Sequence, residues 1–133
     1  MMKEPRHLET GKWGEKVAAK YIKKKGYKLL GKRVHIGTRD EFDLIARDGK
    51  VLVFVEVKTR GSEKYGSPAS SVNRHKRHTL SRAAVRYIKK LRNPRVCFRF
   101  DVVEVIGEMD AAELPVVRHI ENAFPLDSCY ALP

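Results

Sequence analysis

Apolar residues dominate two neighbouring stretches of the chain, residues 41–47 and 51–57, and charged residues recur between the apolar ones. Both stretches are rich in β-branched and aromatic side chains, which is typical of strands. They are joined by Asp48-Gly49, a dipeptide that favours a tight two-residue turn. The pattern therefore predicts a β-hairpin with Asp48 and Gly49 as its loop residues, and the rest of the fold is expected to form around it.

Helical periodicity appears in two further stretches. Thr10 is a suitable N-cap for a helix that runs to about Lys25, and Gly26 follows as a stop signal. Asn73 is a suitable N-cap for a second helix that reaches about Arg92 and ends before a proline. Apolar stretches at 27–36, 95–106 and 116–120 predict three more strands, the first of them an edge strand or a bend.

This order of elements predicts an α/β domain in which two helices pack against a mixed β-sheet. A chain of 133 residues is long enough for one domain with a real core and too short for two. We expect a single domain over residues 1–133, with its core at about 11–124 and short tails at both ends.

Side-chain alternation in the predicted hairpin decides which residues share a face of the sheet. With this turn, Asp43 lies opposite Phe54. Glu41 lies opposite Glu56, and Lys58 has the same parity as Glu56. Three carboxylates and one ammonium group are therefore expected on one face, with Asp43 and Glu56 as diagonal neighbours about 7–8 Å apart at Cα.

Crowded carboxylates on a half-buried strand must be paired, hydrated or bound to a metal ion. The simplest interpretation is a solvated sheet face with a cross-strand ion pair. The alternative is a divalent cation held by Asp43 and Glu56, and oxygen ligands of this kind suit Mg²⁺ or Mn²⁺. In that case Lys58 is placed to orient an attacking water or to stabilise developing negative charge.

The formal net charge of +12 is large for a chain of this length. It indicates a polyanionic partner, most often nucleic acid, with an anionic membrane surface as the lesser option. Only two cysteines are present, and neither a disulfide framework nor a metal-ligand spacing emerges from them. Because no apolar signal region or membrane-spanning stretch stands out, we expect a cytoplasmic protein.

Basic residues gather around the second predicted helix and the long loop before it. A solvated cationic face is one interpretation, and phosphate contact is the favoured one, because like charges packed this densely repel each other unless a polyanion screens them. The predicted nucleic-acid-binding residues are Arg60, Arg74, Lys76, Arg77 and Arg82. His75 and His78 share a helical spacing, but no second pair of ligands accompanies them for zinc.

Asp43 with Glu56-Val57-Lys58 resembles the Asp…Glu-x-Lys signature of the restriction-endonuclease-like nuclease superfamily. The wording of residues 41–60, together with Gly14-Glu15, 66–68, 100–103 and 119–124, is more similar still to the YraN-type family of uncharacterised proteins, itself similar to archaeal Holliday-junction resolvases. Asp40 departs from that family, which commonly has glycine there, so the local turn and the role of Glu41 are expected to differ.

The resemblance implies a restriction-endonuclease-like fold and further site residues. It implies that Glu15 is an additional metal or water ligand, whereas from the residues alone Glu15 is a surface carboxylate near the helix N-terminus. It implies that Lys76 lies near the scissile phosphate. It also implies a homodimer, since junction resolvases act as dimers.

The leading hypothesis is a Mg²⁺- or Mn²⁺-dependent nuclease acting on DNA, with branched or damaged DNA as candidate substrates. Asp43, Glu56 and Glu15 form its metal site, Lys58 positions the water, and Glu41 is an additional candidate. The second hypothesis is a nucleic-acid-binding protein of the same fold without catalytic activity. A third, an adaptor for protein partners, predicts binding that is insensitive to salt.

Overall fold

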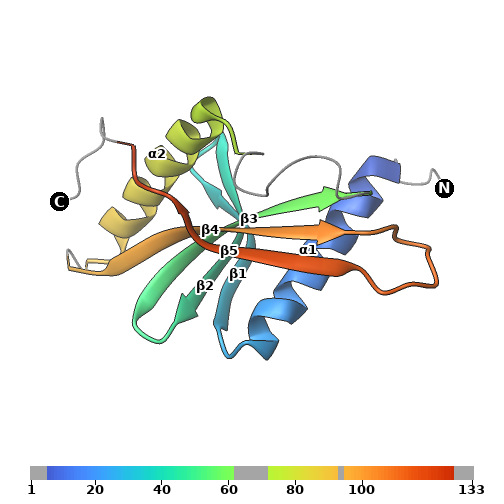
Figure 1. Ribbon diagram of the computed structural model, residues 1–133. Helices are drawn as coiled ribbons and strands as arrows, with labels where there is room; N and C mark the ends of the chain where they lie inside the picture. Colours follow the sequence, from blue (N-terminus) through green and yellow to red (C-terminus); the bar gives the residue numbers. More distant parts are fainter. Residues whose placement is uncertain (1–5, 62–71, 93–94, 128–133) are drawn as a thin grey trace.

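The computed structural model describes residues 6–61, 72–92 and 95–127. The described elements form a central sheet with one helix on each side (Figure 1). In chain order they are α1 (Arg6–Lys24), β1 (Lys28–Ile36), β2 (Asp40–Asp48), β3 (Val51–Arg60), α2 (Arg74–Lys90), β4 (Cys97–Ile106) and β5 (Val116–Phe124). Most of the predicted loop after β3, residues 62–71, lies outside the described residues.

The five strands follow one another across the sheet in the order β1-β2-β3-β4-β5. Neighbouring strands are antiparallel except for β3 and β4, which are parallel. Parallel neighbours need a long crossover connection, and α2 lies in it. The predicted α/β class with a mixed sheet is therefore confirmed, and so is the predicted edge position of the first strand. None of the described helices is both long and apolar enough to cross a membrane.

The end of α1 was predicted correctly and its start was not. Gly26 has φ 95°, and the N–H groups of Gly26 and Tyr27 donate to the carbonyls of Lys23 and Ile22 at 3.0 Å each. This is the glycine-terminated Schellman arrangement. The helix begins at Arg6, so Thr10 lies inside it and is not its N-cap. Glu9, in the first turn, is favoured by the helix dipole and supports this earlier start.

The hairpin turn differs from the prediction by one residue. Asp48 pairs with Val51, so the loop residues are Gly49 and Lys50. Gly49 has φ 59°, and a glycine in the first loop position suits a type II′ turn. Each residue of β2 consequently faces a residue of β3 two positions later than predicted, and the side chains expected on one face of the sheet stay the same. Extending the observed register by one step brings Asp43 opposite Glu56, where Phe54 had been predicted.

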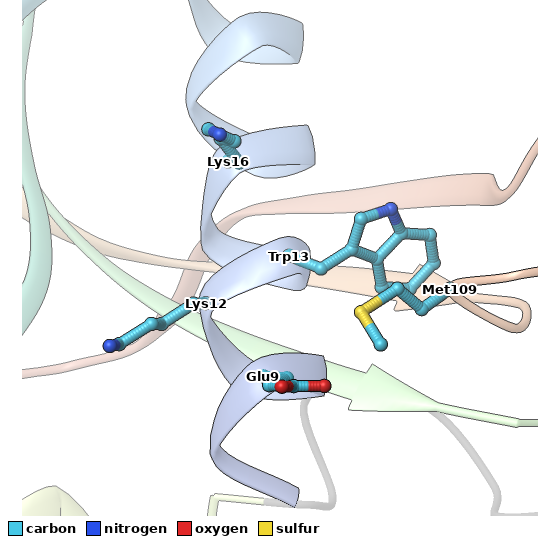
Figure 2. Close-up of a pocket in the computed structure, with 5 residues that line it drawn as sticks. All are labelled: Glu9, Lys12, Trp13, Lys16 and Met109. Carbon is cyan, nitrogen blue, oxygen red and sulfur yellow. The ribbon is translucent and has the colours of Figure 1, made fainter. Parts of the chain in front are cut away.

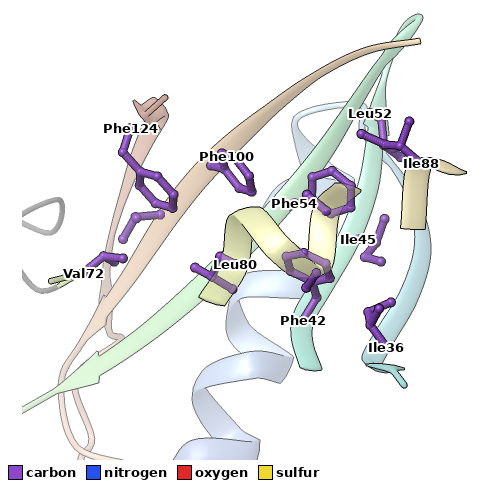
Figure 3. Packing of buried hydrophobic residues seen from close by; sticks show 13 residues of the cluster. Ile36, Phe42, Ile45, Leu52, Phe54, Val72, Leu80, Ile88, Phe100 and Phe124 are labelled. Atoms are coloured by element: carbon purple, nitrogen blue, oxygen red, sulfur yellow. The ribbon is translucent and has the colours of Figure 1, made fainter. Parts of the chain in front are cut away.

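Two hydrophobic clusters lie on opposite faces of the sheet. The cluster under α2 is rich in phenylalanine, with Phe42 stacked on Phe54 at 4.5 Å between ring centroids and Phe100 on Phe124 at 4.8 Å (Figure 3). Such aromatic pairs stabilise the fold by about 0.5–1.5 kcal/mol each beyond the area they bury. The cluster under α1 is rich in alanine and valine, and its buried members are Ala18, Ala19, Ile22, Tyr27, Leu44, Ala46, Val53, Val55, Val103 and Val105.

Regular alternation fails in β2 just before its pairing with β3 begins. Phe42 packs in the cluster under α2, whereas Leu44 packs in the cluster under α1. Residues two apart in a regular strand would share a face. The backbone around Asp43 is therefore irregular, and this irregularity lies at the candidate site.

A buried polar cluster ties β4 and β5 to Tyr27, which lies between α1 and β1. The Asp101 carboxylate is fully buried and lies 2.7 Å from His119 Nε2, while Arg99 Nε donates to it at 2.9 Å and the Asn122 N–H at 2.9 Å. Burial acts to raise the pKa of Asp101, but these hydrogen bonds outweigh it and the pKa is lowered. Arg99 also donates to the Tyr27 hydroxyl at 2.7 Å. These contacts satisfy charges that would otherwise be costly to bury.

Candidate functional site

The candidate site lies where β2 and β3 part. Leu44 and Val55 are the last paired residues at that end of the hairpin. One residue further on, the side chain of Asp43 replaces the backbone as the partner of β3, because its Oδ2 accepts a hydrogen bond from the Val57 N–H at 2.8 Å. A carboxylate thus occupies the position of a backbone carbonyl, and from Glu56 to Arg60 β3 pairs with β4 while β2 pairs with β1.

Glu56 lies in β3 beside this carboxylate and is only 6% exposed. Two lysines balance its charge: Lys58 Nζ is 3.6 Å from Glu56 Oε1, and Lys76 Nζ is 3.8 Å from the same atom. Lys58 comes from the same strand, whereas Lys76 comes from the first turn of α2. The predicted N-cap is confirmed, because Asn73 Oδ1 accepts from the Lys76 N–H at 2.9 Å, and this cap holds Lys76 in place.

The environment of Asp43 raises its pKa to about 7. Burial is the largest cause, and the negative charge of Glu56 is the next. The hydrogen bond from Val57 and the positive charge of Lys76 act in the opposite direction. Asp43 therefore exchanges its proton near neutral pH, and a positive ion beside it would favour the ionised form.

Glu15 reaches the site from α1, on the other face of the sheet from α2. Its charge contributes to the raised pKa of Asp43. Arg33 of β1 lies against it, with Nε 2.7 Å from Glu15 Oε2, and this hydrogen bond raises the pKa of Arg33. Arg33 was not among the predicted site residues. The only sign of it in the sequence is the break in the first strand at 31–33, and Arg33 has the unusual φ of 47°.

Close packing of α1 on β3 brings Glu15 to this position. A Cβ atom added at Gly14 would lie 2.0 Å from Thr59 Oγ1, a distance that only glycine avoids. Thr59 directly follows Lys58 in β3. Gly14 therefore lets the helix approach the strand at the level of the site.

Glu41 is exposed, and the prediction that it faces Glu56 is wrong because the hairpin register is shifted. Its paired residue in β1 is His35, and its charge acts on Arg33. The structure thus brings Asp43, Glu56, Lys58 and Lys76 together with Glu15 nearby, and leaves Glu41 at the solvent side.

Two of the predicted nucleic-acid-binding arginines are engaged with buried carboxylates. Arg82 donates to both oxygens of Asp40, from Nε at 3.0 Å and from Nη2 at 2.7 Å. Asp40, the residue that replaces the common glycine, is only 3% exposed, and the Arg82 hydrogen bonds lower its pKa. Arg60 Nε is 3.1 Å from Oε2 of the buried Glu104. These contacts give both arginines a structural role, and their contact with nucleic acid stays a prediction.

The other two predicted arginines lie in the first turn of α2. Arg74 is exposed. Arg77 is half-buried, donates from Nε to the Val72 carbonyl at 2.9 Å and lies over the Phe124 ring at 5.6 Å. Together with Lys76, Arg74 gives the N-terminal turn of α2 a cationic surface next to Glu56.

The donor set at the site consists of carboxylate oxygens, the ligands that Mg²⁺ and Mn²⁺ prefer. Within residues 6–61, 72–92 and 95–127, no three His, Cys, Asp or Glu side chains are gathered closely enough to form a cation site by themselves. A Mg²⁺ ion usually takes one or two carboxylates and completes its shell with water and phosphate oxygens. Asp43 and Glu56, which repel each other here, supply such a pair.

Residues 14–105 match the model of the family described as "Uncharacterised protein family UPF0102". The chain belongs to the UPF0102 family. The matched range contains Glu15, Asp43, Glu56, Lys58 and Lys76, so the whole candidate site lies within the part that defines the family.

Relatives in the UPF0102 family cover nearly the whole chain. A UPF0102 protein of Geobacter metallireducens is 40% identical over 116 residues, which are 87% of this chain and 92% of the relative. A UPF0102 protein of Syntrophomonas wolfei is 43% identical over 119 residues, covering 87% of this chain and 97% of the relative. One from Caldanaerobacter subterraneus is 42% identical over 125 residues, covering 92% of this chain and all of the relative.

Proposed function

We propose that this UPF0102 protein is a metal-dependent nuclease with a restriction-endonuclease-like fold that hydrolyses phosphodiester bonds in DNA. The observation that carries the proposal is the meeting of two carboxylates and two lysines where β2 and β3 part. Asp43 and Glu56 are close enough for the charge of one to raise the pKa of the other, and Lys58 and Lys76 both lie within 4 Å of Glu56.

Asp43 and Glu56 would hold a Mg²⁺ or Mn²⁺ ion, with Glu15 binding it directly or through water. The raised pKa of Asp43 supports this assignment, because a carboxylate that is reluctant to ionise beside another carboxylate is stabilised by a cation. When bound, such an ion polarises the phosphate and lowers the pKa of a coordinated water.

The two lysines have complementary roles in this proposal. Lys58 donates a hydrogen bond to the attacking water and stabilises the negative charge that develops at the phosphate. Lys76, from α2, binds a non-bridging phosphate oxygen. A bond forms from the water oxygen to phosphorus as one phosphorus–oxygen ester bond breaks, and the products are a phosphomonoester end and a hydroxyl end.

DNA would reach the site along the N-terminal turn of α2. Arg74 is exposed there, two residues before Lys76, and Lys76 contacts Glu56 from the face of the sheet that α2 covers. The net charge of +12 supports long-range attraction of a polyanion. Branched or damaged DNA is the substrate class to test first, and a homodimer is the expected form for cutting two strands.

The deciding experiment is a cleavage panel with linear, nicked and four-way-junction DNA, with EDTA, Mg²⁺ or Mn²⁺. We expect metal-dependent cleavage by the natural protein and a loss of at least about a hundredfold in Asp43→Asn and in Lys58→Ala. Glu41→Gln is the matched control, since it removes an exposed carboxylate of the same strand and should cut normally. Equal cutting by Asp43→Asn and the natural protein would overturn the proposal.

A second candidate function is nucleic-acid binding without cleavage. It is favoured by the two lysines, because they already neutralise Glu56 without an ion. Under this alternative no substrate is cut with any metal, and Glu56→Gln binds DNA at least as tightly as the natural protein. Affinity that falls steeply with salt would still identify phosphate contacts in either case.

A further inference from the structure

A hollow on the surface of α1 is lined by an aromatic side chain from the same helix turn as Glu15. It has a volume of about 480 Å³ and is lined by Glu9, Lys12, Trp13, Lys16 and Met109. Figure 2 shows Trp13 projecting from α1 towards the side on which Met109 lies, in the connection between β4 and β5. We call it the aromatic hollow.

A second hollow adjoins it across the helix. Its volume is about 270 Å³, and it is lined by Lys12, Glu15, Lys16, Lys32 and Arg33. We call it the cationic hollow. Lys12 and Lys16 line both, so the two hollows flank the same turn of α1. Four cations and one carboxylate line the cationic hollow, and that carboxylate, Glu15, is already paired with Arg33 at 2.7 Å.

The packing of α1 on β3 connects the cationic hollow to the carboxylate pair through Glu15, whose charge acts on Asp43. Trp13 and Glu15 are separated by Gly14 alone, and Gly14 contacts Thr59, which follows Lys58. In a helix, residues two apart are rotated by about 200° around the axis, so Trp13 and Glu15 face opposite sides of α1, and Lys12 and Lys16, which line both hollows, lie between them. An aromatic surface, a cationic surface and Glu15 thus follow one another around this turn of α1.

We propose that an unpaired nucleotide of a single-stranded or branched nucleic acid binds across the two hollows, with its base on Trp13 and its phosphate between Lys12, Lys16 and Arg33. This inference rests on the proposed function and names the part of the substrate that the site recognises. A flat π-surface with cations beside it is the arrangement that single-strand-binding proteins use, since stacking accepts any base and lysines follow the backbone.

Size and charge fit this occupant. Ligand sites for small organic groups are typically about 300–1,000 Å³ in volume, and the aromatic hollow lies in that range. An apolar peptide would gain nothing from the cations, whereas a nucleotide uses both surfaces. Bases within a duplex are already stacked, so only an unpaired base can use Trp13 without a large cost.

The protein carries a single tryptophan, so its fluorescence reports this one position. The natural protein is titrated with a ten-nucleotide oligothymidylate and with a blunt duplex of matched length, in EDTA so that no cleavage occurs. We expect the single strand to quench the tryptophan emission and the duplex to leave it nearly unchanged. Unchanged emission at saturation with the single strand, judged by anisotropy of a labelled oligonucleotide, would overturn the inference.

Substitutions separate stacking from general attraction. Trp13→Ala should weaken single-strand binding about tenfold, and Trp13→Phe should retain most of the affinity, while duplex binding changes little in both. Lys16→Ala should weaken single-strand binding more than Lys20→Ala, which removes the same charge from an exposed position of α1 outside both hollows. Equal affinity of the Trp13→Phe and Trp13→Ala proteins, or of the two lysine variants, contradicts the inference.

Failure of this inference and failure of the proposed function give different results. Quenching by the single strand in a protein that cuts nothing leaves the nucleotide site standing and removes the nuclease proposal. If the natural protein cuts DNA in the presence of metal, but its tryptophan emission does not change and Trp13→Ala cuts nicked and junction DNA as well as the natural protein, the nuclease proposal stands and the nucleotide site is removed. Thermal unfolding of each variant verifies that it is folded, and the fluorescence titration needs no variant at all.

Discussion

Asp43 Oδ2 lies 2.8 Å from the backbone nitrogen of Val57, and this hydrogen bond spans the point where β2 and β3 separate. The contact places a carboxylate one residue from Glu56 in β3 and leaves it partly shielded from water. An asparagine in its place keeps an oxygen acceptor for the same N–H and removes the charge. Substitution of Asp43 by asparagine therefore isolates the effect of charge at the site.

The first prediction concerns the pH dependence of stability. The pKa of Asp43 is about 7 in the folded protein and about 3.9 in an unfolded chain. Between these values the folded state holds a proton that the unfolded state releases, so the free energy of unfolding falls as pH rises and the loss is complete above about pH 7. Asp43→Asn does not undergo this loss and should be more stable than the natural protein at pH 8 by about 4 kcal/mol.

Urea unfolding of both proteins from pH 4 to pH 8.5 measures this difference. Glu41→Gln serves as the control and should follow the pH profile of the natural protein. A constant difference between Asp43→Asn and the natural protein across the range would show that Asp43 ionises normally.

The second prediction concerns metal binding. Because a cation relieves the repulsion between Asp43 and Glu56, Mg²⁺ or Mn²⁺ at a concentration about a hundredfold above its Kd should stabilise the natural protein by about 2.7 kcal/mol. Thermal unfolding at pH 8 with and without metal measures the shift. Asp43→Asn and Glu56→Gln should lose it, whereas Glu41→Gln should retain it. A shift of equal size in all four proteins would place the ion elsewhere.

The third prediction concerns the contact between α1 and β3. Gly14→Ala places a methyl group 2.0 Å from Thr59 Oγ1, so the helix must move away, and we expect a loss of about 1–3 kcal/mol in stability. Gly11→Ala is the matched control, since nothing lies within 4 Å of its added Cβ. Alanine at position 11 should stabilise the helix by up to about 1 kcal/mol. Chemical denaturation compares the two, and restoration of Gly14→Ala by Thr59→Ala would confirm the cause.

The fourth prediction separates two arginines that the sequence alone treats alike. Arg82→Ala removes the partner of the buried Asp40 and should destabilise the fold by about 3 kcal/mol. Arg74→Ala should leave stability unchanged, weaken duplex binding and reduce the salt dependence of affinity by about 0.9 in the log–log slope. Denaturation and anisotropy titrations at several salt concentrations test both. A reduced slope for Arg82→Ala in the folded protein would assign phosphate contact to Arg82 as well.

Local pattern predicted most of the fold and the centre of the site. The alternation of β3 and the turn at Gly49 were sufficient to bring Asp43, Glu56 and Lys58 to one region, although the turn was misplaced by one residue. The prediction of which side chains share a face of the sheet remained valid, because each residue's facing partner shifted by two positions. The separation of the strands at Asp43 was not predicted, since the sequence does not show that alternation fails there and that Phe42 and Leu44 pack on opposite faces of the sheet.

Contacts between residues far apart in the sequence could not be predicted from local sequence patterns. Arg82 and Asp40 are 42 positions apart, and nothing in either local pattern shows that they meet. Arg82 was therefore counted as a surface cation. Lys76 and Glu15 entered through family resemblance, because their distance from Glu56 and Asp43 depends on the packing of two helices on opposite faces of the sheet.

The parallel pairing of β3 with β4 has a consequence for the order in which the protein folds. Asp43 and Glu56 belong to one hairpin, whose closure costs little chain entropy. Lys76 lies in the long connection between the parallel strands, and residues as distant in sequence as Val51 and Cys97 pair across that connection. Non-local pairing of this kind is slow. We expect a nascent chain to form the acidic half of the site first, with Lys58 as the one of the two lysines beside Glu56 until the crossover closes and brings Lys76.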